Sequence, residues 1–135
     1  RLLSEFYNMI SIESSHQWMN KYKSKYKYIP LKEMNSEVFG LTQWLDIDIL
    51  KETLKEINYE LLIVDAGGDR IGIYDNIELF NTNVPIIFDD TMNEAYLKCA
   101  TLTAQKINKD ISTITCAQNK FCVTWWDGKK YSIIS

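Results

Sequence analysis

Short apolar runs along the chain predict β-strands that alternate with helices. The runs MISIE, ELLIV and VPIIF are rich in β-branched and other apolar residues, as strands of a buried sheet are. ELLIV is apolar throughout and is therefore expected to lie in the middle of a sheet. The strands predicted in this part of the chain are Met9–Glu13, Tyr26–Leu31, Glu60–Val64 and Val84–Phe88.

Apolar residues at helical spacing separate these strands. From Asp46 the sequence DIDILKETLKEI places Ile47, Leu50 and Leu54 on one face, with Lys and Glu between them. Ser14 or Ser15 is placed to cap an earlier helix. Helices are predicted over 14–26, 46–57, 74–80 and 91–108, whereas residues 33–45 have no clear period and are predicted to form a loop.

The C-terminal part changes character and predicts an antiparallel hairpin. Ile111–Thr115 and Phe121–Trp126 are rich in β-forming residues, and AQNK between them supplies a turn. Four strand–helix alternations followed by a hairpin imply one α/β domain over residues 1–135. Its expected architecture is a mostly parallel sheet with helices on both faces and an antiparallel edge.

Composition narrows the class of protein. Hydrophobic residues make up 46% and charged residues 24% of the chain, the balance of an ordinary globular protein. With a net charge of −3, no nucleic-acid partner is expected, and the lysines of KYKSKYKY (residues 21–28) are interpreted as a solvated face. No apolar run approaches the roughly 20 residues of a membrane span, so no membrane partner is expected. A cytoplasmic location is predicted, with Cys99, Cys116 and Cys122 as reduced thiols.

Three of the predicted strands end on acidic residues. Glu13 closes the first strand, Asp65 follows ELLIV, and Asp89 and Asp90 follow VPIIF. Ligands of open α/β sheets gather at the carboxyl ends of the strands. Because charged pairs are costly to bury without a partner, the acids are expected to converge on a ligand.

These acids carry a resemblance to a known family. A strand ending in Glu (ISIE), one ending in Asp before glycines (IVDAGGD) and one ending in Asp-Asp (IIFDD), with a closing hairpin, resemble the Rossmann-like S-adenosylmethionine-dependent methyltransferases. The resemblance implies that Glu13 binds the ribose hydroxyls of S-adenosylmethionine and that Ser14 lies beside its adenine. Asp65 and Gly67 are the other cofactor-binding residues it implies.

Metal-dependent O-methyltransferases within that family hold a divalent ion between an Asp after the fourth strand and an acidic pair after the fifth. Asp65, Asp89 and Asp90 are similar to that set, which implies a Mg²⁺ site. Carboxylate oxygens suit this ion, which would lower the pKa of a bound substrate hydroxyl. Asp65 and Asp69 are the predicted catalytic residues. An alternative interpretation is that Asp90 caps the helix beginning near Thr91 while Asp89 merely ends its strand.

The chain departs from the family in one respect. The glycine-rich turn that wraps the methionine part of the cofactor would precede Met9, and this sequence holds no such segment. Three functions are therefore weighed. The first is methylation of a small-molecule hydroxyl, on a sugar or similar metabolite, and the second is a non-catalytic Rossmann-like module for assembly or partner binding. The third is another nucleotide- or sugar-using enzyme on the same sheet. Without its first strand the expected sheet has exposed central edges, through which a homodimer could form.

Overall fold

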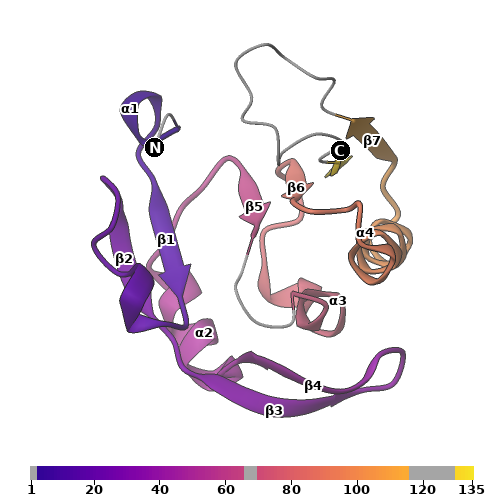
Figure 1. The fold of residues 1–135 in the computed structure, drawn as a ribbon, viewed down its shortest axis with the longest axis horizontal. Coiled ribbons are helices and arrows are strands. Elements are labelled where there is room, and N and C mark those ends of the chain that lie inside the picture. Colours follow the sequence, from indigo (N-terminus) through magenta and orange to yellow (C-terminus); the bar gives the residue numbers. More distant parts are fainter. Residues whose placement is uncertain (1–2, 66–69, 116–129) are drawn as a thin grey trace. The chain divides into compact units, whose positions relative to one another are not determined.

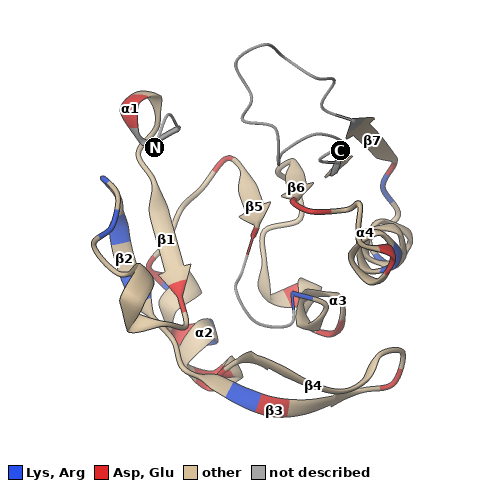
Figure 2. Ribbon diagram, in the orientation of Figure 1, with Lys and Arg blue, Asp and Glu red and all other residues tan. Residues whose placement is uncertain are grey.

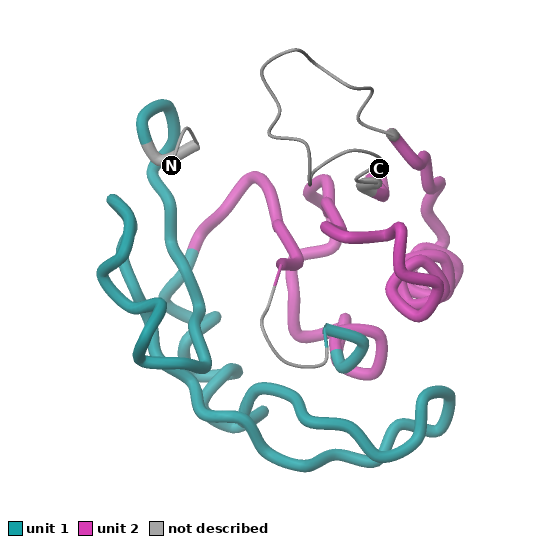
Figure 3. The backbone as a smooth tube through the Cα atoms, viewed as in Figure 1, with its two compact units in different colours: residues 1–57, 66–72 teal, residues 58–65, 73–135 magenta. Residues whose placement is uncertain are grey.

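The computed structural model describes residues 3–65, 70–115 and 130–135. The chain forms two compact units, which are described separately below (Figure 3). The first unit comprises residues 1–57 and 66–72, and the second comprises residues 58–65 and 73–135.

The first unit contains two small sheets and one helix of more than two turns (Figure 1). Its elements are α1 (Leu3–Phe6), β1 (Ile10–Glu13), the 3₁₀ turn η1 (His16–Trp18), β2 (Lys25–Tyr28), β3 (Leu31–Ser36), β4 (Gly40–Leu45) and α2 (Ile47–Lys55). β1 and β2 are parallel, with Ile10 opposite Lys25 and Glu13 opposite Tyr28. β3 and β4 form an antiparallel hairpin, in which the Ser36 hydroxyl accepts the Phe39 N–H at the turn.

Helix α2 begins where its sequence provides a strong cap. The Asp46 carboxylate accepts the backbone N–H groups of Asp48 and Ile49, which have no partner within the helix. The helix buries Leu50 and packs against β4. Fully buried Ile29 belongs to the same unit, together with Trp44 of β4.

The second unit is built on a mixed four-stranded sheet in the order β5-β6-β8-β7. Its elements are β5 (Leu62–Val64), α3 (Gly72–Asp75, whose first residue belongs to the first unit), the 3₁₀ turn η2 (Ile77–Leu79), β6 (Ile86–Phe88), α4 (Glu94–Lys106), β7 (Ile111–Thr115) and β8 (Lys130–Ile134). β5 and β6 are parallel, and β8 is antiparallel to both of its neighbours, β6 and β7. Helix α4 packs on β7 and β8, where Cys99, Ala100 and Ala104 are buried along with Phe88 and Ile134.

The predicted fold class is wrong. The described residues form three separate sheets, two of two strands and one of four, instead of one extended parallel sheet with helices on both faces. Parallel pairing is limited to β1–β2 and β5–β6, and the other pairs are antiparallel. The prediction failed because the sequence shows where strands begin and end locally, while pairing depends on contacts between distant segments. The homodimer through exposed edges stays a prediction.

Two segments adopt a different secondary structure from the predicted one. The helix expected over 14–26 is reduced to η1, and β2 begins within it at Lys25. The loop expected over 33–45 is the β3–β4 hairpin, which places Leu41 at the surface and Thr42 inside. This inversion of the usual burial hides the strand from a hydropathy pattern.

Most of the other predicted elements are confirmed with shifted ends. The strand predicted over Tyr26–Leu31 is instead divided between β2 and β3, and the helix predicted over 74–80 is the short helix α3 followed by the 3₁₀ turn η2. Strands lie at Ile10–Glu13, Leu62–Val64 and Ile86–Phe88, although ELLIV forms an edge strand and not a central one. Helix α4 begins at Glu94 and not near Thr91. The predicted hairpin strand Phe121–Trp126 lies outside the described residues, as do Cys116 and Cys122. Within the described ranges, no helix combines the length and apolar character needed to cross a membrane.

Candidate metal centre

The second unit brings three carboxylates together at the carboxyl ends of two neighbouring strands. Asp65 directly follows β5, and Asp89 and Asp90 directly follow β6. Because β5 and β6 are parallel and in register, with Val64 opposite Phe88, both strands end at the same edge of the sheet. Figure 2 shows the acidic positions immediately after each strand.

The three side chains are close enough to share one ion. One carboxylate oxygen from each of Asp65, Asp89 and Asp90 lies within 4.8 Å of the other two. Asp89 is buried with 8% of its surface exposed, Asp90 is half-buried and Asp65 is exposed. The cluster therefore opens to solvent on the Asp65 side.

The backbone fixes the two aspartates that follow β6. The Asp89 N–H donates to the Val64 carbonyl at 3.1 Å, which extends the β5–β6 ladder by one residue. The Asp90 N–H then donates to Asp89 Oδ1 at 2.8 Å. Asp90 has a φ of 56°, a left-handed conformation that Asp tolerates better than most residues. The strand thus ends in a tight turn that presents both carboxylates.

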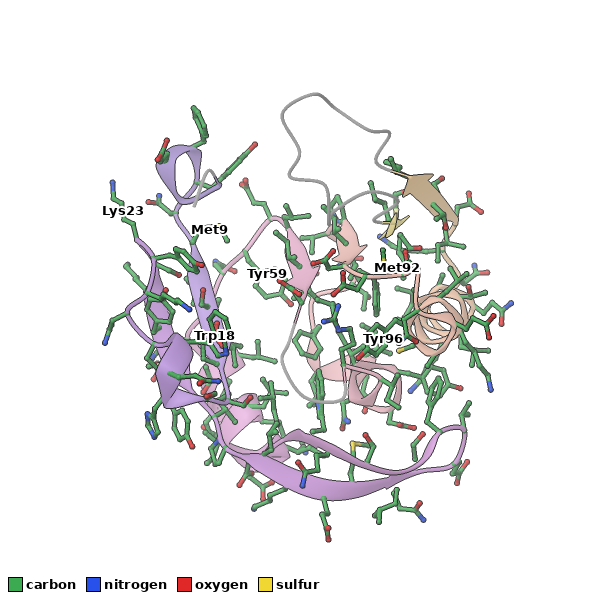
Figure 4. All side chains as sticks on the ribbon, in the orientation of Figure 1. Met9, Trp18, Lys23, Tyr59, Met92 and Tyr96 are labelled. Carbon is green, nitrogen blue, oxygen red and sulfur yellow. The ribbon has the colours of Figure 1, made fainter. Side chains whose placement is uncertain are left out.

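A chain of three hydroxyls, of which those of Thr91 and Ser132 are buried, holds Thr91 against β8. Ser132 donates to Thr91 Oγ1 at 3.0 Å, and its oxygen lies 3.1 Å from Thr113 Oγ1. Because Ser132 has one hydroxyl proton, Thr113 must act as the donor to Ser132. Thr91 and Ser132 are 1% and 0% exposed. This network anchors the segment between β6 and α4. The exposed residue Met92 of that segment is labelled in Figure 4.

The alternative role predicted for Asp90, as the cap of α4, is wrong. Asn93 caps that helix, and its side-chain oxygen accepts the Ala95 N–H at 2.9 Å. Asp90 instead uses its carbonyl to accept the Asn93 N–H at 3.0 Å. The Asp90 carboxylate is therefore not needed as a helix cap.

The donor set fits a hard divalent cation. Ca²⁺ takes oxygen ligands at about 2.3–2.6 Å, so two oxygens on one Ca²⁺ lie at most about 5 Å apart. The three carboxylates of the cluster meet this limit with their 4.8 Å separation. For Mg²⁺, whose ligand distance is about 2.1 Å, two ligand oxygens lie at most about 4.2 Å apart. This limit is shorter than the 4.8 Å within which the three carboxylate oxygens lie. Three carboxylates also leave coordination positions for water or substrate oxygens.

Asp65 is shared by the predicted cofactor set and the acidic cluster, but the other described cofactor residues belong to the first unit. Glu13 ends β1 and Ser14 follows it, both in the first unit, whereas the three aspartates belong to the second. Partial burial raises the pKa of the Glu13 carboxyl above its ordinary value. Gly67 and Asp69 lie outside the described residues. The described part of the chain thus assembles the predicted metal ligands, while the predicted cofactor set is not assembled within one unit.

Sequence reasoning missed the residues that position the cluster. Thr91 could have been singled out because it directly follows the two aspartates. Its buried partner Ser132 could not, because Ser132 lies in the last strand and no local pattern connects the two residues. Asn93, followed by Glu94, is a capping pattern that could have been recognised.

The comparisons with known proteins add no relative. No protein-family model matches the chain, and neither the curated proteins nor the solved structures gave a match. Any function must therefore be argued from the residues themselves.

Proposed function

We propose that the chain binds a divalent cation between Asp65, Asp89 and Asp90 and uses it to hold and activate a hydroxyl group of a small-molecule substrate. The observation that carries the proposal is the approach of three carboxylate oxygens to within 4.8 Å of one another at the ends of two adjacent strands. A bound cation would favour the ionised form of a coordinated hydroxyl, which makes that oxygen a better nucleophile.

Methyl transfer is the reaction that we propose for this hydroxyl, with S-adenosylmethionine as the methyl donor. It is supported by the resemblance of ISIE, IVDAGGD and IIFDD to the methyltransferase motifs. S-adenosylmethionine supplies an electrophilic methyl group when bound. Of the residues that the resemblance assigns to it, Glu13 and Ser14 belong to the first unit and Asp65 to the second.

Cation binding is tested by calorimetric titration of the chain with CaCl₂ and, separately, with MgCl₂. The test variant is Asp89→Asn with Asp90→Asn, because Asn keeps the side-chain acceptor that Asp89 provides and tolerates the left-handed backbone of Asp90. We expect binding heat with the natural sequence and none with this variant. A matched control, Glu60→Gln with Asp110→Asn, removes the same charge from exposed positions of the second unit and should bind as the natural chain does.

Methyl transfer is tested separately by titration with S-adenosylmethionine in the presence of the cation. Binding heat that disappears in Glu13→Gln would support the cofactor assignment. If the cation binds through the aspartates but S-adenosylmethionine gives no heat, the methyltransferase proposal fails while the cation site remains, and the non-catalytic module becomes the better interpretation. Equal cation binding by the double Asn variant would overturn the site itself.

A further inference from the structure

One segment of the first unit has a charge opposite to that of the whole chain. Between Ser14 and Lys32 the sequence contains no Asp or Glu. It does contain lysines at alternate positions, Lys21, Lys23, Lys25 and Lys27. All four are exposed. Figure 2 shows this concentration of basic positions on β2 and on the residues leading into it.

Aromatic rings are exposed in the same segment. Trp18 is 43% exposed, and Lys21 Nζ lies 3.7 Å from the centre of its ring. Tyr28 is 40% exposed while it stacks on His16, with ring centres 4.0 Å apart and planes inclined by 15°. Each ring thus has a neighbour that orients it and still presents surface to solvent. Exposed rings beside lysines match a ligand that has both flat apolar and anionic groups.

The segment is also held in a defined conformation. The Tyr26 hydroxyl accepts the Tyr22 N–H at 2.8 Å and donates to the Tyr22 carbonyl at 3.2 Å, which closes the turn that carries Lys23. Ser24 donates to the Met9 carbonyl and so ties the turn to the residue before β1. Figure 4 shows Lys23 extending away from the ribbon near the start of β2. The lysines and rings are therefore presented by an ordered surface.

We propose that this surface, defined by Trp18, Lys21, Lys23, Lys25 and Tyr28, binds single-stranded nucleic acid. Among the described residues β2 pairs with β1 alone, so its other edge is open there for a strand of nucleic acid to follow. Bases stack on exposed aromatic rings without strong sequence preference, and lysines neutralise the phosphates between them. Lys27 is excluded from the surface because it pairs with Glu56 at 2.9 Å.

The net charge of −3 does not oppose this binding. At physiological ionic strength, charges more than about 8 Å apart are largely screened, so a phosphate responds to the lysines beside it and not to the total charge. The expectation of a purely solvated lysine face, taken from the overall composition, is revised accordingly. The inference is independent of the cation site because it uses residues of the first unit alone.

The test is fluorescence anisotropy with labelled RNA and DNA oligonucleotides of about 12 nucleotides, a length within the usual site sizes of single-strand binding proteins. Measurements are made in EDTA, so that a failure of the cation site cannot affect them. Lys21→Ala with Lys23→Ala and Lys25→Ala should flatten the dependence of log K on log salt by about 2, since each phosphate contact contributes about 0.7. The control, Lys51→Ala with Lys55→Ala and Lys98→Ala, removes three other exposed lysines and should leave the slope nearly unchanged.

A second variant isolates stacking from charge. Trp18→Leu keeps an apolar side chain but removes the flat ring, and it should weaken binding by about 5-fold to about 150-fold without changing the salt slope. Trp18→Phe should recover most of that loss. Far-ultraviolet circular dichroism of each variant checks that the unit is folded.

Three outcomes would overturn the proposal. Heparin that competes as well as the oligonucleotide, combined with no effect of Trp18→Leu, would show that the surface takes any polyanion. Sedimentation with phosphatidylserine vesicles but no oligonucleotide binding would identify a membrane surface instead. No change in affinity with the lysine variant would place any nucleic-acid binding elsewhere on the chain. If the proposal holds, the tighter-binding probe, RNA or DNA, shows which of the two nucleic acids the surface binds.

Discussion

Two glycines of the first unit are needed for different physical reasons, and substitution can separate those reasons. Gly40 begins β4 with a φ of +77°, and a Cβ built on it would meet no atom within 4 Å. Gly72 has no such backbone requirement, but a Cβ there would lie 2.5 Å from Cγ of Trp44. Gly40 is therefore required by its backbone, and Gly72 by the ring packed on it.

The expected costs follow from these distances. Ordinary contacts of a Cβ begin at 3.4 Å, whereas a Cβ at Gly72 would lie 2.5 Å from Trp44 Cγ. Gly72→Ala must therefore displace the Trp44 indole, although Trp44 is only 3% exposed. Overpacking of this kind costs about 1–3 kcal/mol, against a gain of about 0.4–1 kcal/mol from the less flexible unfolded chain. At Gly40 an Ala side chain meets no steric obstacle, and the left-handed conformation alone costs about 1–2 kcal/mol.

Asparagine distinguishes the two cases. It tolerates the left-handed region, so Gly40→Asn should destabilise less than Gly40→Ala. It is larger than alanine, so Gly72→Asn should destabilise more than Gly72→Ala. The free energy of unfolding is measured for all four variants by urea titration, with far-ultraviolet circular dichroism as the signal that monitors unfolding. A smaller loss for Gly72→Asn than for Gly72→Ala would refute the packing argument, and equal losses at Gly40 would refute the backbone argument.

Three further substitutions test local contacts. Asn93→Ala removes the cap of α4 and should lower the free energy of unfolding by about 1 kcal/mol in urea titration, whereas Asn93→Asp should restore most of it. Ser132→Ala breaks the buried hydroxyl chain and should cost about 1–3 kcal/mol, because Thr91 keeps a buried hydroxyl without this donor. Lys32 Nζ lies 2.6 Å from the Asp46 carboxylate, and its hydrogen bond lowers the pKa of that carboxyl below the ordinary value of 3.8. The stability gained from this pair is therefore present above pH 3.8 and is lost as the pH falls through the lowered pKa. Lys32→Met should therefore destabilise the chain at pH 7 but much less at pH 2; an equal loss at both values would contradict the pairing.

The acidic cluster could be predicted because both strand ends are visible in the sequence and the expected parallel pairing of β5 with β6 is present. A strand that ends on an acid is visible in the sequence, and two adjacent parallel strands must present their ends at one edge. ELLIV followed by Asp65, and VPIIF followed by Asp89 and Asp90, therefore indicated the grouping without knowledge of the whole sheet. The same reasoning does not extend to Glu13, because β1 belongs to a separate sheet.

The errors came from patterns that depend on tertiary contacts. Trp18 and Tyr22 are four residues apart, as on a helix, but the Tyr26 hydroxyl captures both backbone groups of Tyr22 and closes a turn. At the start of β4 the usual burial is reversed, since Leu41 is 74% exposed and Thr42 is 5% exposed. A hydropathy pattern assumes that apolar residues face inward, so it could not find this strand.

The contacts that position the proposed cation ligands all come from one unit. The carboxylates of Asp65 and Asp89 are positioned by the β5–β6 pairing, and the segment after Asp90 is held by the hydroxyl of Ser132 on β8. All of these contacts lie within the second unit, and none involves the Glu13 side chain, which belongs to the first unit. Glu13→Gln should therefore leave cation affinity unchanged in the calorimetric titration. Conversely, Ser132→Ala should weaken cation binding without touching a ligand, because it loosens the segment that carries the aspartates.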